Sequence, residues 1–446
     1  MEQLSIVDPA EHFVPTTFTP GAAVVLSGTI QNLRRLAWGG FALLRTPQYM
    51  IQVVLDGSNP QLPLDQLRPE TTVRITGRVK PATITDRAVH PNDVEIHASA
   101  IELISQPSVA DFPVDITKKE LNAGLSPLFD HRPLTLRHPK QRALFRVQAT
   151  VQNAYGEYLS TIGFTRIASP KLVFSGAEGG ANIFKLDYFG RQAFLAQSPQ
   201  FYKQMMVGVF GRVYEVAPVY RAEKHNTSRH LNEYISLDLE MQVDHSFHEI
   251  MQVEANVLNT IFERLQTTCS HEVELLELKL PPKISKLTLV DFAEALEIVY
   301  REYGFDQRDQ PDLAPESEGH ICDYAKRNWD SDFVFVTGFP TEKRPFYTMN
   351  DPADPRRTLS FDLLFRGLEV TTGGQRLHQY DDYIQKMTQF GMDPTPFASY
   401  LQTFKYGMPP HGGLGLGLER FTARLCGIDN IKMLSLFPRD IDRLEP

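Results

Sequence analysis

Hydrophobic and polar residues alternate along much of the chain between residues 22 and 104. In the clearest run, Tyr49 to Leu55, apolar side chains recur at every second position, the period of a strand with one buried face. Similar runs, separated by turn-forming pairs, lie at 24–30, 73–77 and 94–96. Short strands of this kind predict a small β-barrel of the OB type, a fold that commonly binds single-stranded nucleic acid. We place this first domain at residues 1–105.

The hydrophobic period changes to that of a helix after Pro139. Apolar residues then recur at helical spacing from Leu144 to Tyr158, with the proline near the start of the predicted helix. A second helix is expected to begin at Ser246, which forms a capping-box pattern with Glu249. Strand-like runs lie at 194–196, 213–219, 235–243, 333–336 and 361–370.

These patterns predict an α+β fold in which the N-terminal barrel is followed by an antiparallel sheet flanked by helices. Residues 106–138 contain four prolines and little periodicity, so we expect a hinge there and a second domain at 139–446. The stretch from about 271 to 345 reads as an insertion to which the sequence assigns no function.

The composition narrows the class of protein. The 446 residues suggest two or three domains, and no apolar run is long enough to predict a membrane span. The first residues do not resemble a secretory signal, and the three cysteines lie far apart, which favours a reducing cytoplasm. The net charge of -9 counts against nucleic-acid binding in general but leaves room for a local basic face.

Three clusters carry candidate chemistry. Arg221 follows a predicted strand and is suited to a phosphate group, although such an arginine is also common in surface ion pairs. Asp362 and Glu369 lie in a strongly apolar run and could hold Mg²⁺, or pair with neighbouring arginines. The glycine-rich run 412–417 would let the backbone approach a ligand closely, and its spacing fits neither a Walker loop nor GxGxxG.

Taken in order, these clusters resemble the three signature motifs of the class II aminoacyl-tRNA synthetases. The helix from Pro139 with a strand ending at Pro170 resembles the first motif, which forms the dimer interface in that class. The segment from Tyr220 to Glu240 resembles the second motif, and Gly415 to Arg420 resembles the third. Further stretches resemble the aspartyl branch of archaeal and eukaryotic type: 178–180, 197–204, 373–376 and 436–440.

The resemblance implies an ATP-dependent aspartate–tRNA ligase that needs Mg²⁺ and acts on ATP, L-aspartate and tRNA(Asp). Arg221 and Arg420 would be the catalytic cations, with Arg221 on the α-phosphate and Arg420 on adenine and the γ-phosphate. Tyr234 would stack on the other face of adenine. Three more side chains would contact the nucleotide: Glu223, His230 and Glu369. Asp362 and Glu369 would bind Mg²⁺.

For the amino acid, the resemblance assigns Ser198, Gln200 and Asp238 to the α-amino end and Glu178 to a loop that closes over aspartate. Lys203 and Arg376 would face the side-chain carboxylate. Two cations suit aspartate, because asparagine would leave buried positive charge uncompensated. In the barrel, Phe41 and Gln52 align with anticodon-contacting positions, while barrel core is the alternative for Phe41. Arg34, or its neighbour Arg35, would contact phosphate.

Three alternatives remain open in the sequence. Gln31 and Pro81 resemble the relaxed type of enzyme, which charges both tRNA(Asp) and tRNA(Asn) with aspartate. An asparagine synthetase-like paralogue would lack the barrel, and a non-catalytic descendant would be expected to have lost ATP- or Mg²⁺-binding residues. The resemblance also implies a homodimer.

Overall fold

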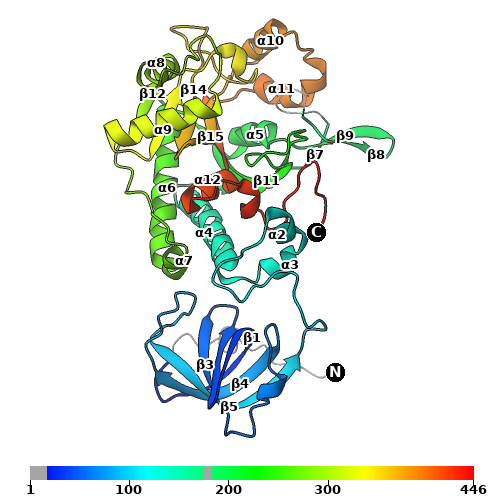
Figure 1. Ribbon diagram of the computed structural model, residues 1–446. Helices are drawn as coiled ribbons and strands as arrows, with labels where there is room; N and C mark the ends of the chain where they lie inside the picture. Colours follow the sequence, from blue (N-terminus) through cyan, green and yellow to red (C-terminus); the bar gives the residue numbers. More distant parts are fainter. Residues whose placement is uncertain (1–17, 175–181) are drawn as a thin grey trace. The chain divides into compact units, whose positions relative to one another are not determined.

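The computed structural model describes residues 18–174 and 182–446, and these form two compact units. Of the described residues, the first unit comprises 18–143, 274–276 and 446, and the second comprises 144–174, 182–273 and 277–445. Figure 1 shows the strands of the first unit and the larger sheet of the second. No helix among the described residues combines the length and the apolar character that a membrane crossing needs.

The first unit contains a closed barrel with strand order β1-β2-β3-β5-β4, which confirms the predicted OB-type fold. Its core consists of the alternating side chains that predicted the strands, among them Ile51, Val53 and Leu55, all of which are buried. β3 and β5 pair in parallel and the other neighbours are antiparallel. The barrel strands are β1 Ala23–Leu36, β2 Gly39–Arg45, β3 Met50–Asp56, β4 Thr72–Pro81 and β5 Val94–Ser105.

The segment expected to be a hinge contains two short helices, α2 (Leu125–Asp130) and α3 (Arg132–Thr135). Pro133 lies in the first turn of α3, where its missing N–H costs no hydrogen bond. Two of the prolines that suggested irregular structure therefore belong to these helices.

The second unit is built on an eight-stranded sheet with order β12-β13-β14-β15-β16-β11-β10-β6. The pairs from β13 to β10 are all antiparallel, as predicted, and only the two edge pairs are parallel. Its strands are β6 Thr165–Arg166, β10 Arg212–Tyr220, β11 Glu233–Gln242, β12 Leu289–Asp291, β13 Phe333–Thr337, β14 Ser360–Phe365, β15 Leu368–Gln375 and β16 His411–Gly417. A separate three-stranded sheet contains β7 Leu172–Val173, β8 Lys185–Tyr188 and β9 Arg191–Leu195.

The apolar run 361–370, which looked like one strand, folds as the hairpin β14–β15. Arg366 and Gly367 form its two-residue turn with φ values of 46° and 85°. Positive φ at both central positions is the conformation that matches the twist of a tight hairpin, and glycine adopts it without strain. The turn brings Asp362 and Glu369 onto adjacent strands of the sheet.

Helices flank this sheet (Figure 1). α4 spans Pro139–Thr161, as its apolar spacing predicted, whereas α6 spans His248–Thr268 and begins two residues after the predicted start at Ser246. Glu249 still accepts a hydrogen bond from the Ser246 N–H at 2.9 Å, so the capping pattern holds the chain just before the helix. The strand expected to end at Pro170 is short and ends at Arg166. The remaining helices are α5 Gln200–Phe210, α7 Ser270–Leu275, α8 Phe292–Tyr303, α9 Pro315–Trp329, α10 Tyr380–Gln389, α11 Ala398–Lys405 and α12 Leu418–Cys426.

The stretch 271–345 does not form a separate insertion. Its strands β12 and β13 extend the main sheet, and its helices α8 and α9 bury apolar faces against them. Asp291 caps α8 by accepting the Ala293 N–H at 3.0 Å, and Gly304 ends the helix in the left-handed conformation.

One polar group is buried in the core of the second unit without a hydrogen bond. Glu254 of α6 is 2% exposed, and neither of its carboxyl oxygens has a partner among the described residues. Burial raises the pKa of Glu254 from 4.5 to about 8, so the carboxyl is protonated at neutral pH.

The free energy of unfolding should therefore fall as the pH rises from about 4.5 towards 8, because ionisation of Glu254 is easier in the unfolded chain. E254Q removes this ionisation. Relative to wild type it should gain roughly 3 kcal/mol of stability between about pH 5 and about pH 8 in urea denaturation followed by circular dichroism. E263Q, at an exposed position of the same helix, is the control and should show no such trend. Parallel pH profiles for E254Q and wild type would contradict the assignment.

Candidate active site

The second unit contains a pocket of about 400 Å³ above the middle of the main sheet. β11, β15 and β16 form its floor, and the start of α5, the loop after β10 and the start of α12 contribute to its walls. Most of the residues predicted to bind ATP or the amino acid lie in this pocket: Ser198, Gln200, Lys203, Arg221, Glu223, His230, Tyr234, Asp238, Glu369, Arg376 and Arg420.

The glycine-rich run forms part of the floor of the pocket. In β16, Gly415 and Gly417 face the pocket, whereas Leu414 and Leu416 are buried on the other side of the sheet. Gly415 pairs with Asp238 of β11 and with Thr372 of β15. Because a strand alternates its faces, a Gly-Leu repeat gives a side-chain-free floor on one face and core packing on the other. A ligand can therefore lie directly on the backbone of β16.

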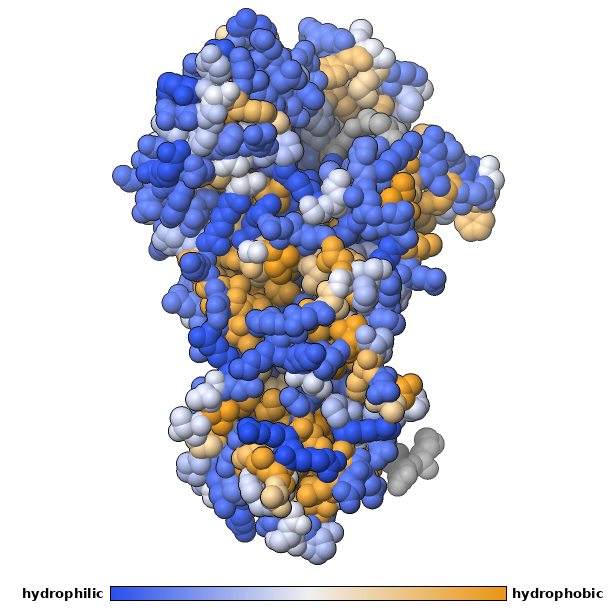
Figure 2. All heavy atoms as spheres, viewed as in Figure 1, coloured by the Kyte–Doolittle hydropathy of each residue, from blue (hydrophilic) through white to orange (hydrophobic). Residues whose placement is uncertain are grey.

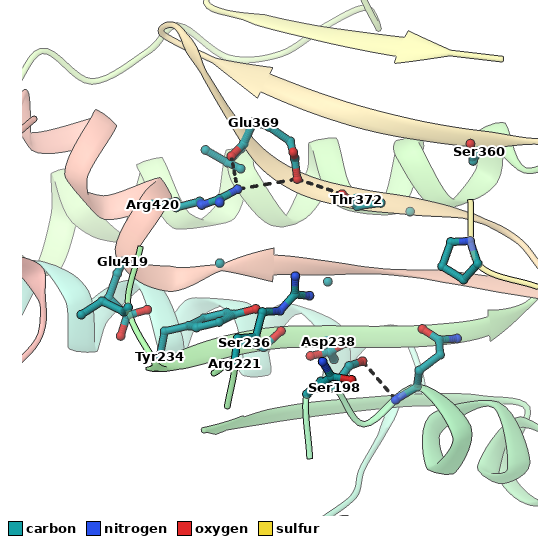
Figure 3. A pocket seen from close by; sticks show the side chains of 18 of the residues that line it. Ser198, Arg221, Tyr234, Ser236, Asp238, Ser360, Glu369, Thr372, Glu419 and Arg420 are labelled. Atoms are coloured by element: carbon teal, nitrogen blue, oxygen red, sulfur yellow. Dashed lines mark hydrogen bonds and ion pairs between the residues drawn. The ribbon is translucent and has the colours of Figure 1, made fainter. Parts of the chain in front are cut away.

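At one end of the pocket, aromatic and charged groups face one another (Figure 3). Arg420, in the first turn of α12, lies 3.8 Å from the Glu369 carboxylate and donates to the Glu369 backbone oxygen at 3.3 Å. Tyr234 and Arg221 extend from β11 and from the end of β10. Burial, together with the charge of Arg420, lowers the pKa of His230, so this imidazole is neutral at pH 7. Two arginines beside a tyrosine ring suit an anionic, aromatic ligand.

The two predicted Mg²⁺ ligands occupy different surroundings. Glu369 lines the pocket and accepts a hydrogen bond from Thr372 at 2.9 Å. Asp362 is 5% exposed, and Arg344 donates to its Oδ2 at 2.8 Å. Its Oδ1 is buried and has no hydrogen-bond partner in the described chain. Burial raises the pKa of Asp362 to about 7 despite the opposing charge of Arg344.

The donor set fits Mg²⁺ only in part. Two carboxylates on neighbouring strands, one with an unused oxygen, are the hard oxygen ligands that Mg²⁺ prefers. Within residues 18–174 and 182–446, no group of three or more His, Cys, Asp or Glu side chains converges to hold a metal. The protein alone therefore offers no cage, and the remaining ligands would have to be phosphate oxygens and water.

The opposite end of the pocket holds a buried cluster of charges. Lys203, 2% exposed, donates to Asp238 at 2.9 Å and lies 3.3 Å from Glu240. Arg376, 5% exposed, donates through Nε to Glu240 at 2.9 Å. Burial alone would raise the pKa of Glu240, but the charges of Arg376 and Lys203 outweigh this effect and lower it. The two cations predicted to face a substrate carboxylate are thus held by a carboxylate of the protein.

Acceptor atoms collect beside this cluster at the start of α5. Ser198 accepts the Gln200 N–H at 3.1 Å, which orients the first turn of the helix. Asp238 Oδ2 and Gln197 Oε1 are buried in the pocket wall and have no hydrogen-bond partner among the described residues. Unused acceptors of this kind suit a ligand with N–H groups.

Sequence reasoning did not select four residues that shape the pocket. Glu240 and Gln197 lie within motif-like stretches: Glu240 stands two positions after Asp238 on the same strand, and Gln197 directly precedes Ser198. These placements were the available signal. Arg344 and Glu318 come from the stretch 271–345, where no signal pointed to the pocket. Glu318 accepts hydrogen bonds from Arg229 at 2.7 Å and from the Glu369 N–H at 2.8 Å. Helix α9 therefore stabilises the pocket wall at Glu369. Glu178 lies outside the described residues.

The three barrel residues lie on one outward face of the first unit. Arg34 pairs with Phe41 across β1 and β2, and Gln52 pairs with Leu43 across β2 and β3. Phe41 is half-buried and packs edge-on against Trp38, whereas its neighbour Ala42 is in the barrel core. Phe41 is therefore not a core residue. Gln52 donates to Glu95 at 2.8 Å.

Residues 126–441 match the family model described as tRNA synthetases class II (D, K and N). The chain belongs to this family. Its match spans all three motif-like segments and the whole of the pocket, so the α+β fold with its glycine-lined sheet is that of a synthetase catalytic domain.

Individual relatives of the synthetase match nearly the whole chain. The aspartate–tRNA(Asp/Asn) ligase of Thermus thermophilus is 44% identical over 426 residues, covering 96% of this chain and 97% of the relative. The cytoplasmic aspartate–tRNA ligase of Caenorhabditis elegans is 34% identical and covers 95% of this chain and 84% of the relative. The structure of asparaginyl-tRNA synthetase from Pyrococcus horikoshii complexed with asparaginyl-adenylate aligns with a TM-score of 0.85, at 30% identity, over 96% of this chain and 97% of that one.

Glu240 holds two buried cations in the synthetase, so neutralising it should leave them unpaired. E240Q is expected to lower the free energy of unfolding by roughly 3–5 kcal/mol, the cost of breaking a buried ion pair on one side. E157Q is the matched control, because Glu157 pairs with Arg264 on the surface and should contribute less than about 1 kcal/mol. Chemical denaturation measures both variants, and similar losses in the two would refute a special role for the buried cluster.

Proposed function

We propose that this synthetase is an ATP-dependent aspartate–tRNA ligase that forms aspartyl-adenylate and transfers aspartate to the 3′ end of tRNA(Asp), with tRNA(Asn) as a second acceptor. The observation that carries the proposal is the buried cluster of Lys203, Arg376, Glu240 and Asp238 at the amino-acid end of the pocket. The Thermus thermophilus and Deinococcus radiodurans relatives are named aspartate–tRNA(Asp/Asn) ligases, which supports the second acceptor.

The charges of this cluster favour aspartate over asparagine. The Oδ2 of Asp238 has no hydrogen-bond partner among the described residues and can accept a hydrogen bond from the α-ammonium group of the amino acid. With Asp238 so engaged, Lys203, Arg376 and Glu240 carry a net charge of +1. An aspartate side chain neutralises that charge, whereas a neutral asparagine side chain leaves it buried and uncompensated.

The same pocket can position both reactants of the first step. The α-carboxylate of aspartate attacks the α-phosphorus of ATP, a P–O bond to the leaving pyrophosphate breaks, and aspartyl-adenylate forms. Arg221 binds the α-phosphate, and Arg420 offsets charge at the γ-phosphate while Tyr234 and Arg420 enclose adenine. Glu223 and His230 hold the nucleotide from the loop after β10. No side-chain nucleophile is needed, so catalysis rests on placement and charge.

Glu369 and the Oδ1 of Asp362, which has no hydrogen-bond partner among the described residues, would hold Mg²⁺. When bound, the ion supplies positive charge to the phosphate oxygens. Arg344 keeps the other oxygen of Asp362 engaged, which leaves one oxygen of that carboxylate for the metal.

In the second step, the 3′-hydroxyl of the terminal ribose attacks the adenylate carbonyl, aspartate is transferred as an ester, and AMP leaves. We assign anticodon binding to residues 1–105, a hinge to 106–138 and catalysis to 139–446. Phe41 would stack on an unpaired base, Gln52 would contact a base edge and Arg34 a phosphate, from the shared outward face of β1 to β3. The loop containing Glu178 would complete the amino-acid site.

A homodimer that works in the cytoplasm is part of the proposal. Figure 2 shows apolar side chains on the surface of the second unit around α4, the helix that resembles the first motif. Several large apolar residues of this unit are exposed in the isolated chain: Leu172, Phe174, Phe189, Val209 and Phe210. Apolar side chains that gather on a surface, as around α4 in Figure 2, are typical of protein interfaces.

Asparagine ligation is the second candidate, because the Pyrococcus horikoshii structure carries asparaginyl-adenylate. The net positive charge of Lys203, Arg376 and Glu240 argues against asparagine as the substrate. An asparagine synthetase-like paralogue that passes aspartyl-adenylate to ammonia has no use for the N-terminal barrel.

Aminoacylation with labelled amino acid tests the proposal. The wild-type synthetase with ATP and Mg²⁺ should charge tRNA(Asp) and tRNA(Asn) with aspartate and neither with asparagine. Charging of tRNA(Asp) alone would remove the second acceptor. Aspartate-dependent pyrophosphate exchange without charging of either tRNA would point to the paralogue.

K203M should remove the preference for a carboxylate. We expect the KM for aspartate in pyrophosphate exchange to rise about 100-fold with a KM for ATP close to wild type, since a charged hydrogen bond is lost in a buried site. K171M is the control: Lys171 pairs with Glu215 at 2.9 Å but does not line the pocket. Equal effects of the two variants would contradict the assignment of Lys203.

E369Q should raise the Mg²⁺ concentration needed for half-maximal exchange by roughly 10-fold, because an amide is a weaker ligand than a carboxylate for a hard cation. Binding of Mn²⁺ in the presence of ATP, followed by electron paramagnetic resonance, should weaken in parallel. E302Q, at an exposed glutamate of α8, serves as the control. Unchanged Mn²⁺ binding in E369Q would exclude Glu369 as a ligand.

A further inference from the structure

Behind the amino-acid end of the pocket lies a chain of buried hydrogen bonds that the proposed reaction does not use directly. It joins α5, α10, α11 and β16 through four side chains, each at most 3% exposed: Gln204, Tyr383, Tyr400 and His411. Gln204 lies at its centre and does not line the pocket. Its neighbour one helical turn earlier, Gln200, does.

The direction of the hydrogen bonds is fixed at His411. Its Nδ1 lies 2.9 Å from the Pro409 carbonyl oxygen, which can only accept, so Nδ1 carries the proton. Burial lowers the pKa of His411 to about 4, and the ring is therefore neutral with Nε2 as an acceptor. The Gln204 Nε2 donates to this His411 Nε2 at 3.0 Å and to the Tyr383 hydroxyl at 3.0 Å.

With its nitrogen bound to His411, the Gln204 amide must present its oxygen on the other side. There Oε1 accepts from the Tyr400 hydroxyl at 2.9 Å and from the Gln200 Nε2 at 3.1 Å. A flipped Gln204 would place its oxygen against the lone pair of His411 and leave buried groups unpaired, which is costly. The Gln200 nitrogen is thereby held away from the ligand, and its carbonyl oxygen is the atom left to face the pocket.

We propose that His411, Gln204 and Tyr400 form a hydrogen-bond relay of fixed direction that orients the Gln200 amide as an acceptor and so selects an α-ammonium group over an α-hydroxyl group. This inference rests on the proposed function, because it assumes that Gln200 meets the α-amino end of aspartate. The relay residues are positioning residues: none of the three lines the pocket. Their effect reaches the ligand only through Gln200.

The test compares two ligands that differ at this one group: L-aspartate as substrate and L-malate, which has a hydroxyl in place of the ammonium, as inhibitor of aspartate-dependent pyrophosphate exchange. Q204M removes both polar ends of the central amide at similar volume. The KM for aspartate should rise about 10-fold or more while the inhibition constant of malate changes little, because a hydroxyl can accept a hydrogen bond from a flipped Gln200 and an ammonium cannot. The kcat and the KM for ATP should stay near wild type.

Q148M is the matched control. Gln148 is another buried glutamine of the second unit, and it donates to the Leu434 carbonyl at 2.7 Å, outside the relay. This variant should lose stability without changing the ratio of malate inhibition constant to aspartate KM. If Gln204 contributed only to structure, Q204M would weaken the binding of malate and of aspartate equally, and that result would overturn the proposal.

Y400F removes only one hydroxyl and keeps the packed ring, so it decides the matter even if Q204M fails to fold. As in Q204M, the ratio of the malate inhibition constant to the KM for aspartate should fall, here by about 3-fold, as expected for the loss of one hydrogen bond. An unchanged ratio in Y400F would overturn the relay while leaving aspartate activation intact. Absence of aspartate-dependent exchange in the wild-type protein would instead refute the proposed function itself.

Discussion

Placing Glu240 between Lys203 and Arg376 is the constraint around which the second unit is arranged. Three ionised groups that are almost fully buried are tolerable only if each has a partner of opposite charge at short range. The partners come from α5, from β11 and from the end of β15, so these elements must meet in one register. Gly413, opposite Glu240 in β16, leaves the space that this carboxylate occupies, since a Cβ there would collide with it.

The floor of the pocket follows from the same register. β16 lies between β11 and β15 and gives glycine to the pocket side and leucine to the core side. A strand that alternates in this way cannot slip by one residue, because the leucines would then fill the pocket and the core would lose its packing. The hairpin turn at Arg366 and Gly367 fixes the position of β15. Glu369 and Thr372 therefore lie on one side of β16, and Asp238 lies on the other.

Sequence reasoning recovered the elements whose signal is local. The barrel, α4, β10 and β11 follow from hydrophobic periodicity, and Arg221, Lys203 and Arg420 were found through motif resemblance. It failed where tertiary contacts decide. The single apolar run at 361–370 became a hairpin because two residues adopt positive φ. Arg344 and Glu318 were missed because their partners lie far away in the chain, at Asp362 and at Arg229. The orientation of a buried amide such as Gln204 depends on hydrogen-bonding neighbours that are distant in the sequence, and the spacing of residues along the chain does not reveal them.

Glu318 connects the α8–α9 region to the pocket through its hydrogen bonds with Arg229 and with the Glu369 N–H. A helix of the stretch that looked like an optional addition supplies a side chain to the rim of the nucleotide end. Its two bonds tie the loop after β10 to the β14–β15 hairpin, and each of those segments supplies residues expected to touch ATP. Trimming this region in a shortened enzyme would therefore loosen the nucleotide site from a distance, although none of the removed backbone lies against the ligand.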